Sequence, residues 1–246
     1  NIMLCNIEST REKPVFDTDP AFTSDLQDWG KMSQDILIWD YNIQFANPLS
    51  PFPNLHTIGP NIKFYIQNNV RALFMQATGN KGEFGHLRAY LISKLMWDPE
   101  ANPDAIIEDF LMGYYGKAAP FVNQYIEKMR LSLLNDNFRL NIFGDPRDAV
   151  KNYLAPELMN EYNDLFDNAE KAVLGDEEKH HRVREARLAL LIAEIQIAGQ
   201  IPVEQDGSFY EINSNGKVIP KPAMREKLED FIKRAKKAGM LRVGER

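Results

Sequence analysis

The chain has 246 residues, a formal net charge of −6 and 44% hydrophobic residues. This length and composition allow one large globular domain or two small ones with a sizeable core. The acidic balance argues against a nucleic-acid-binding protein, because such binding rests on a basic surface. The single cysteine, Cys5, excludes an internal disulfide framework and a cysteine-based zinc site. No apolar run approaches the ~20 residues that a membrane-spanning helix needs.

Three short segments of the first hundred residues share one pattern. They are IMLCNIE at 2–8, ILIWDYN at 36–42 and VRALFMQ at 70–76. Each begins mostly apolar on both faces, as a parallel strand covered on both sides does, and turns polar at its carboxyl end. The repeat of about 34 positions matches the spacing of βαβ units. These segments are therefore predicted to be parallel strands.

Helical patterns separate these strands. Thr23 or Ser24 is the expected cap of the first helix, Pro60 lies in the expected first turn of the second, and the third covers 83–97. From Asn102 onward the pattern is almost entirely helical, with a predicted hairpin at 209–219 that turns at Asn215-Gly216. The further helices are expected at 102–113, 118–135, 155–174, 176–199 and 222–239.

The fold class expected from this order is α/β followed by all-α, with domains at 1–99 and 100–246. Three strands do not close a (β/α)8 barrel, which takes eight, and a small parallel sheet leaves its edges exposed. The chain opens at NIMLCNIES without an N-terminal arm. We therefore expect residues 1–99 to be the C-terminal part of a TIM barrel, about three βα units, whose earlier strands lie upstream or come from another copy.

The first two strands each end near a carboxylate, Glu8 and Asp40. In barrels the reacting groups lie at the carboxyl ends of the strands. Two carboxylates facing one pocket are the minimum for glycoside hydrolysis: one protonates the leaving oxygen, and the other attacks the sugar or activates water. Asp40 is the expected base or positioning group and Glu8 its partner. The structural alternative is that they cap the next helices or pair with Arg11 or Lys31.

Aromatic and amide side chains follow at the same ends. Tyr41, Phe45 and Phe52 offer rings that suit the C–H faces of a sugar, and Asn42 and Gln76 add hydrogen-bonding groups. The loop from 43 to 58 is longer than a usual βα connection, and its three prolines stiffen it. The alternative for these rings is packing in the core.

The segment GNKGEFGHLR at 79–88 follows the third strand. Glu83 could cap its helix or bind sugar hydroxyls, and Arg88 could hold the carboxylate of an acidic sugar in a bidentate pair. Structural roles are equally compatible with both. His180 and His181 lack the i, i+4 spacing of a metal pair, so no metal or organic cofactor is expected.

Four stretches carry a resemblance to a known family: NIESTR, WDYNIQFANPLSPFPNL, ALFMQATGNKGEFGHLRAYLISKLMWDPEANPDAIIEDFLMGYYGKAA and HRVREARLALLIAEIQIA. Over nearly its whole length the chain resembles the bacterial family catalogued as domain of unknown function 4838, which occurs in carbohydrate-utilising bacteria. That family is distantly similar to the α-glucuronidases of glycoside hydrolase family 67 and the hexosaminidases of family 20, which have a (β/α)8 barrel.

The resemblance implies that the three strands are the sixth, seventh and eighth of a barrel and that the general acid lies outside this chain. Glu8 and Asp40 would correspond to later carboxylates, and Glu83 to a glutamate of family 20 that binds sugar hydroxyls. The implied partners are a carbohydrate substrate and the upstream barrel half of the same protein, and the implied location is the periplasm or cell surface.

We therefore expect a glycoside hydrolase that acts by carboxylate acid/base catalysis. Asp40 and Glu8 are the expected catalytic residues. The alternatives are a non-catalytic carbohydrate-binding protein on an enzyme-like barrel, and a structural module whose rim is filled by its own side chains. The expected substrate-binding residues are Tyr41, Asn42, Gln76, Glu83, Phe45, Phe52 and Arg88.

Overall fold

A computed structural model describes residues 2–77, 82–135 and 137–240. Its first part contains a parallel sheet in the order β1-β2-β3, formed by β1 (Ile2–Cys5), β2 (Ile36–Tyr41) and β3 (Val70–Gln76). The three predicted parallel strands are confirmed, as is the mixed α/β class. However, β1 ends at Cys5, so Glu8 lies on the loop that follows it. Residues 79–81 of the segment after β3 lie outside the described residues.

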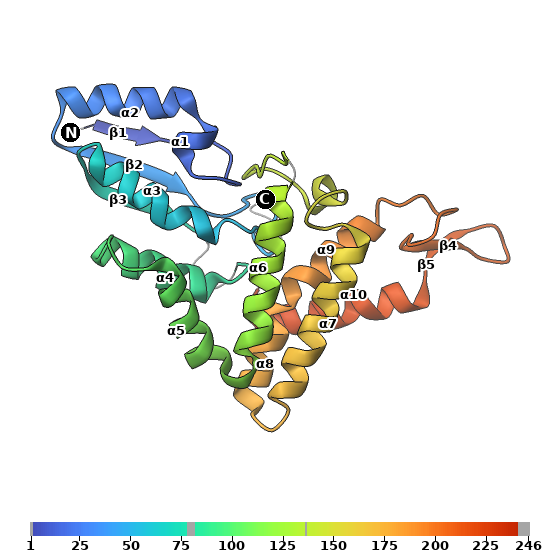
Figure 1. Cartoon of the computed structure of the whole chain (residues 1–246). Coiled ribbons are helices and arrows are strands. Elements are labelled where there is room, and N and C mark those ends of the chain that lie inside the picture. The colour runs from blue at the N-terminus through green and yellow to red at the C-terminus, as the bar shows by residue number, and fades with distance from the viewer. Residues whose placement is uncertain (1, 78–81, 136, 241–246) are drawn as a thin grey trace.

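Helices α1 (Val15–Thr18), α2 (Pro20–Met32) and α3 (Leu55–Gln67) pack against one face of this sheet. Figure 1 shows α2 and α3 running alongside the strands. Leu26 of α2 and Tyr65 of α3 meet Ile36 and Ile38 of β2 in a core whose side chains are almost fully buried. The alternation along β2 explains this contact, because every second side chain faces the helices.

Two predicted helix starts are wrong. The cap of α2 is Asp19, whose side chain accepts a hydrogen bond from the Phe22 N–H, so Thr23 lies inside the helix. Aspartate before a proline in the first turn is the stronger start signal. Pro60 lies inside α3, not in its first turn. The helix extends back past the proline because Leu55 buries its side chain in the core. Pro60 is tolerated although it cannot donate a backbone hydrogen bond.

The rest of the chain is mostly helical and follows the predicted order. The expected single helix at 176–199 is instead divided at Arg187 into two helices. A short antiparallel hairpin, β4 (Tyr210–Ile212) with β5 (Val218–Pro220), confirms the prediction, and Gly216 takes the positive φ of its turn. The further helices are α4 (Gly85–Trp97), α5 (Pro103–Tyr115), α6 (Ala119–Asn135), α7 (Pro156–Ala172), α8 (Glu177–Ala186), α9 (Leu188–Ala198) and α10 (Pro222–Lys237), with short 3-10 turns at Gly116–Ala118 and Pro146–Ala149.

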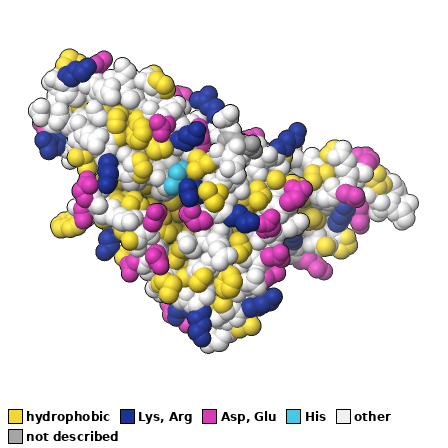
Figure 2. Space-filling model, viewed as in Figure 1, with side chains coloured by type: hydrophobic (Ala, Val, Ile, Leu, Met, Phe, Trp, Pro, Cys, Tyr) yellow, Lys and Arg dark blue, Asp and Glu magenta, His cyan; other side chains and the backbone are white. Residues whose placement is uncertain are grey.

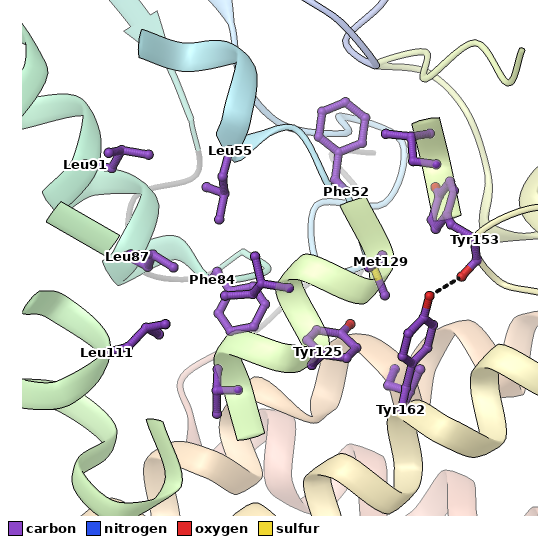
Figure 3. Packing of buried hydrophobic residues seen from close by; sticks show 14 of the residues in the cluster. Phe52, Leu55, Phe84, Leu87, Leu91, Leu111, Tyr125, Met129, Tyr153 and Tyr162 are labelled. Carbon is purple, nitrogen blue, oxygen red and sulfur yellow. Dashed lines mark hydrogen bonds between the residues drawn. The ribbon is translucent and has the colours of Figure 1, made fainter. Parts of the chain in front are cut away.

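The largest core joins the sheet-containing part to the helical part. It includes Leu91 of α4, Leu111 of α5, Tyr125 of α6 and Tyr162 of α7. Figure 3 shows this packing, with the Tyr162 hydroxyl donating to the Tyr153 carbonyl at 3.0 Å. Residues on both sides of position 99 therefore share one core. Within the described residues, no helix is long and apolar enough to cross a membrane. Figure 2 shows charged side chains of both signs spread among apolar ones over the visible face.

Leu26→Ala should lower the free energy of unfolding by about 2–5 kcal/mol, because Leu26 is fully buried between α2 and the sheet and its truncation leaves a cavity. Met32→Ala, at a position on the same helix that is 70% exposed, is the matched control and should change it by less than about 0.5 kcal/mol. Urea denaturation followed by circular dichroism measures both. Equal effects of the two substitutions would contradict this packing.

Candidate functional site at the carboxyl ends of the strands

One face of the sheet is exposed. In β2, Ile36, Ile38 and Asp40 are buried, whereas the residues between them point the other way and are half-buried. On that second face Met3 of β1 is 57% exposed and Phe74 of β3 is 49% exposed. A parallel sheet usually has both faces covered. We call this surface the open face.

Aromatic side chains line the open face toward the carboxyl ends of the strands. Trp39 stacks on Tyr41, with ring centroids 5.8 Å apart and an interplanar angle of 12°. Phe74 meets the Trp39 ring edge-on at 5.1 Å. The Trp39 indole N–H donates to Gln76 Oε1 at 2.6 Å, and Phe45 packs edge-on against Tyr41 at 5.7 Å. The result is a fixed, half-exposed aromatic surface with an amide beside it.

Asp40 points to the opposite face and is 1% exposed. Its Oδ1 accepts from Asn6 Nδ2 at 2.7 Å and from the Tyr41 backbone N–H at 2.8 Å. Its Oδ2 accepts from the Tyr65 hydroxyl at 3.0 Å. The guanidinium of Arg11 lies 3.8 Å from Oδ1. Internal partners therefore surround the Asp40 carboxylate, which is the geometry of a structural anion.

Arg11 joins the loop after β1 to the end of β2. Its Nε donates to the Tyr41 carbonyl at 2.7 Å, and its Nη2 donates to the Asn6 carbonyl at 2.9 Å. A further hydrogen bond runs from Nη1 to the Ser9 carbonyl. The pairing of Asp40 with Arg11, the structural alternative drawn from the sequence, is thus the arrangement observed.

Glu8 is exposed on the loop after β1. Its carboxylate makes no hydrogen bond or ion pair with any residue that the structure describes. Because Asp40 is buried against the helices, Glu8 and Asp40 do not face a common pocket in the described part of the chain. The expected catalytic pair is therefore not assembled here.

The predicted sugar-binding residues divide into exposed and buried positions. Tyr41 and Gln76 are half-buried on or beside the open face. Burial raises the pKa of Tyr41 above its usual value, so its hydroxyl keeps its proton at neutral pH. Asn42, Phe45 and Phe52 are at most 6% exposed. Packing, the alternative reading of the two phenylalanines, describes them better than an exposed sugar platform.

Glu83 and Arg88 form a buried ion pair, with Arg88 Nη2 3.4 Å from Glu83 Oε2. Arg88 is 1% exposed and also donates to Asn54 Oδ1 at 2.5 Å. Arg88 is therefore not presented to an acidic sugar, because it is buried and both its Nη groups donate to internal acceptors. Burial raises the pKa of Glu83 to about 7, although Arg88 acts in the opposite direction.

Trp39 and Phe74 were not among the predicted binding residues. The alternation of side chains along a strand could have found Trp39, because it shares a face with Tyr41 while Asp40 continues the row of Ile36 and Ile38. Within the described residues, no group of three or more His, Cys, Asp or Glu side chains is arranged to hold a metal ion.

Asp40→Asn should lower the free energy of unfolding by about 1–3 kcal/mol. The amide places a donor where the carboxylate accepts hydrogen bonds, and it removes the charge next to Arg11. Urea denaturation measures the change. Asp35→Asn, at an exposed position just before β2, is the control and should leave stability unchanged. An Asp40→Asn variant as stable as the wild type would contradict the structural role.

The stability that Glu83 contributes should fall as pH rises from its usual pKa of 4.5 through about 7. In this range the folded chain keeps a proton on Glu83 that the unfolded chain loses, so the folded state binds more protons. Glu83→Gln cannot titrate, and its melting temperature relative to the wild type should therefore rise with pH over this window. Thermal melts at a series of pH values test this.

Loss of the Glu83 carboxylate leaves Arg88 without its ion-pair partner and adds an offset that does not vary over the same pH window. Glu204→Gln, at an exposed loop position, is the control for charge alone. A difference between wild type and Glu83→Gln that stays constant from pH 4.5 to pH 8 would show that Glu83 titrates at its ordinary pKa.

Comparison with known proteins assigns the first half of the chain to a protein family. The family described as "Domain of unknown function (DUF4838)" matches residues 1–127. The match contains the whole sheet and continues to the first half of α6. No curated protein and no solved structure matches the chain. Since just over half of its residues match, the chain belongs to the DUF4838 family.

Proposed function

We propose that this chain supplies the last strands of a carbohydrate-active (β/α)8 barrel of the glycoside-hydrolase type, and that sugar binds at the open face. The observation that carries the proposal is the half-exposed stack of Trp39 and Tyr41 beside Gln76. These groups lie at the carboxyl ends of parallel strands, where barrel enzymes bind their substrates.

The chemistry of the open face suits a sugar ring. Stacked aromatic rings offer flat apolar surface for the C–H groups of the sugar. The Tyr41 hydroxyl can donate or accept, and the amide of Gln76 adds a donor and an acceptor for sugar hydroxyls. Because the contact with Gln76 fixes the Trp39 indole, the binding surface is largely preformed, which reduces the entropy lost on binding.

A barrel accounts for the exposure of the sheet. In a closed barrel the open face would point to the interior, where Met3 and Phe74 would pack against strands supplied by the upstream half of the same protein. Closure would also pair the two sheet edges, which are otherwise open to aggregation. The strand order and the parallel register are compatible with three consecutive barrel strands.

Hydrolysis needs two carboxylates near the glycosidic bond. Glu8, exposed after β1, is the candidate from this chain, and the general acid would come from the upstream strands. Asp40 would act on the site indirectly, as a positioning residue, because it accepts a hydrogen bond from the Tyr41 backbone N–H. Export to the periplasm or cell surface would bring such an enzyme to external glycans.

Carbohydrate binding without catalysis is the second candidate. It is favoured by the surroundings of Asp40, whose oxygens are occupied by Asn6, Tyr41 and Tyr65. If Glu8 has no carboxylate partner across the barrel, the open face would still bind a sugar and would leave its glycosidic bond intact.

Trp39→Ala in the full-length parent protein should weaken sugar binding by about 1–3 kcal/mol, the transfer free energy of a large apolar side chain. Calorimetric titration with aryl hexosaminides and glucuronic-acid-capped oligosaccharides measures binding, and product release from the same panel measures turnover. Trp97→Ala is the control, because Trp97 is a tryptophan that is 90% exposed at the end of α4. Unchanged sugar affinity of Trp39→Ala would exclude the open face as the sugar-binding site.

Glu8→Gln separates the two candidate functions. If the parent protein is a hydrolase, this variant should bind the sugar and lose turnover. If the parent protein and Glu8→Gln both bind sugar but neither turns over any glycoside, carbohydrate binding without catalysis is the correct function.

A further inference from the structure

A cavity of about 520 Å³ lies away from the open face, where the loop after β2 and the start of α3 meet α5 and α6. Its volume is in the usual range of small-molecule sites. Figure 3 labels side chains that line it, among them Phe52, Leu55 and Tyr125. Most of the wall is apolar and comes from Phe52, Leu55, Phe84, Ile107, Ile126 and Met129.

Tyr125 of α6 lines the cavity with an unpaired hydroxyl. The residue is 1% exposed, and its hydroxyl has no hydrogen-bond partner among the residues that the structure describes. Two other buried tyrosines have partners: the hydroxyl of Tyr65 donates to Asp40, and that of Tyr162 donates to the Tyr153 carbonyl. A buried hydroxyl without a partner is unfavourable, so a molecule that enters the cavity gains by pairing with it.

His56 adds a second unpaired group to the wall. Its Nε2 lies 2.9 Å from the Glu12 carbonyl, which can only accept, so Nε2 carries the hydrogen. Burial lowers the pKa of His56, and the ring is therefore neutral at pH 7. Nδ1 is then a lone-pair acceptor. It is buried and has no partner within the described ranges, so it requires a hydrogen-bond donor.

The charges of the wall are paired. Arg130 binds Glu127, with Nη2 2.6 Å from Oε2, and Glu83 lies against Arg88. Asp104 is exposed at the start of α5. The enclosed part of the cavity therefore offers no uncompensated charge for an ionic ligand, and its polar groups are few compared with its apolar surface.

We propose that this cavity binds a small neutral aromatic alcohol, whose ring contacts the apolar wall and whose hydroxyl pairs with that of Tyr125. A hydroxyl is both donor and acceptor and can therefore pair with another hydroxyl. A sugar is a poorer fit, because its several hydroxyls would face apolar side chains and lose their hydrogen bonds to water. The proposal is independent of the sugar site on the open face.

Phenol is the probe. Toluene is its control, because it carries a methyl group in place of the hydroxyl on the same ring. Titration of the chain by ligand-detected NMR should show saturable binding of phenol. Tyr125→Phe should weaken phenol about 3- to 10-fold, the usual effect of one hydrogen bond, and leave toluene unchanged. Tyr162→Phe is the control, because the Tyr162 hydroxyl is bound elsewhere and the residue does not line the cavity.

Ile107→Trp fills the cavity from a half-buried position on α5 and should abolish binding of both probes, while its circular dichroism and melting curve stay close to those of the wild type. Retained phenol binding in this variant would place the ligand elsewhere and overturn the proposal. Absence of saturable phenol binding to the wild type would overturn it too. Binding of glucose that Ile107→Trp removes would show that the ligand class is wrong.

Discussion

The buried carboxylate of Asp40 is the interaction on which the sheet's carboxyl end depends. It accepts hydrogen bonds from Asn6 after β1, from its neighbour Tyr41 and from Tyr65 of α3, and Arg11 compensates its charge. One carboxylate thus holds together three segments, which are the loop after β1, the end of β2 and α3. Such a network stabilises the fold only while each of its groups has a hydrogen-bond or ion-pair partner. An unpaired charge or donor in the protein interior lowers the free energy of unfolding.

The pattern of the sequence predicts the order of the elements well and the orientation of β2 poorly. The run Ile36–Trp39 is apolar on both faces, so nothing in it says which face meets the helices. The sequence therefore predicts Asp40 in the pocket, whereas the packing of Leu26 and Tyr65 against Ile38 turns it away. The polar end of a strand indicates a site, but the side on which each polar group lies is decided by tertiary packing.

Other differences have a local origin in one place and a tertiary origin in others. The capping preference of Asp19 fixes the start of α2, and this local signal was present in the sequence. The division of 176–199 at Arg187 has a tertiary component, because the Arg187 guanidinium binds Asp167 and Glu170 of the neighbouring α7. The cavity beside Tyr125 could not be predicted at all, since its wall joins segments about 70 residues apart in the chain.

The core shared between α4, α5, α6 and α7 has a consequence for how the molecule unfolds and evolves. Residues on both sides of position 99 bury one another's apolar surface, so neither half keeps this shared core when the other is removed. The two halves should melt as one cooperative unit, and a cut between them would give two chains with exposed apolar surfaces. The family match itself ends inside α6. The helices from α4 to α7 thus form a wall against which the βα units pack, and a different helical module in their place would leave the same apolar side chains exposed.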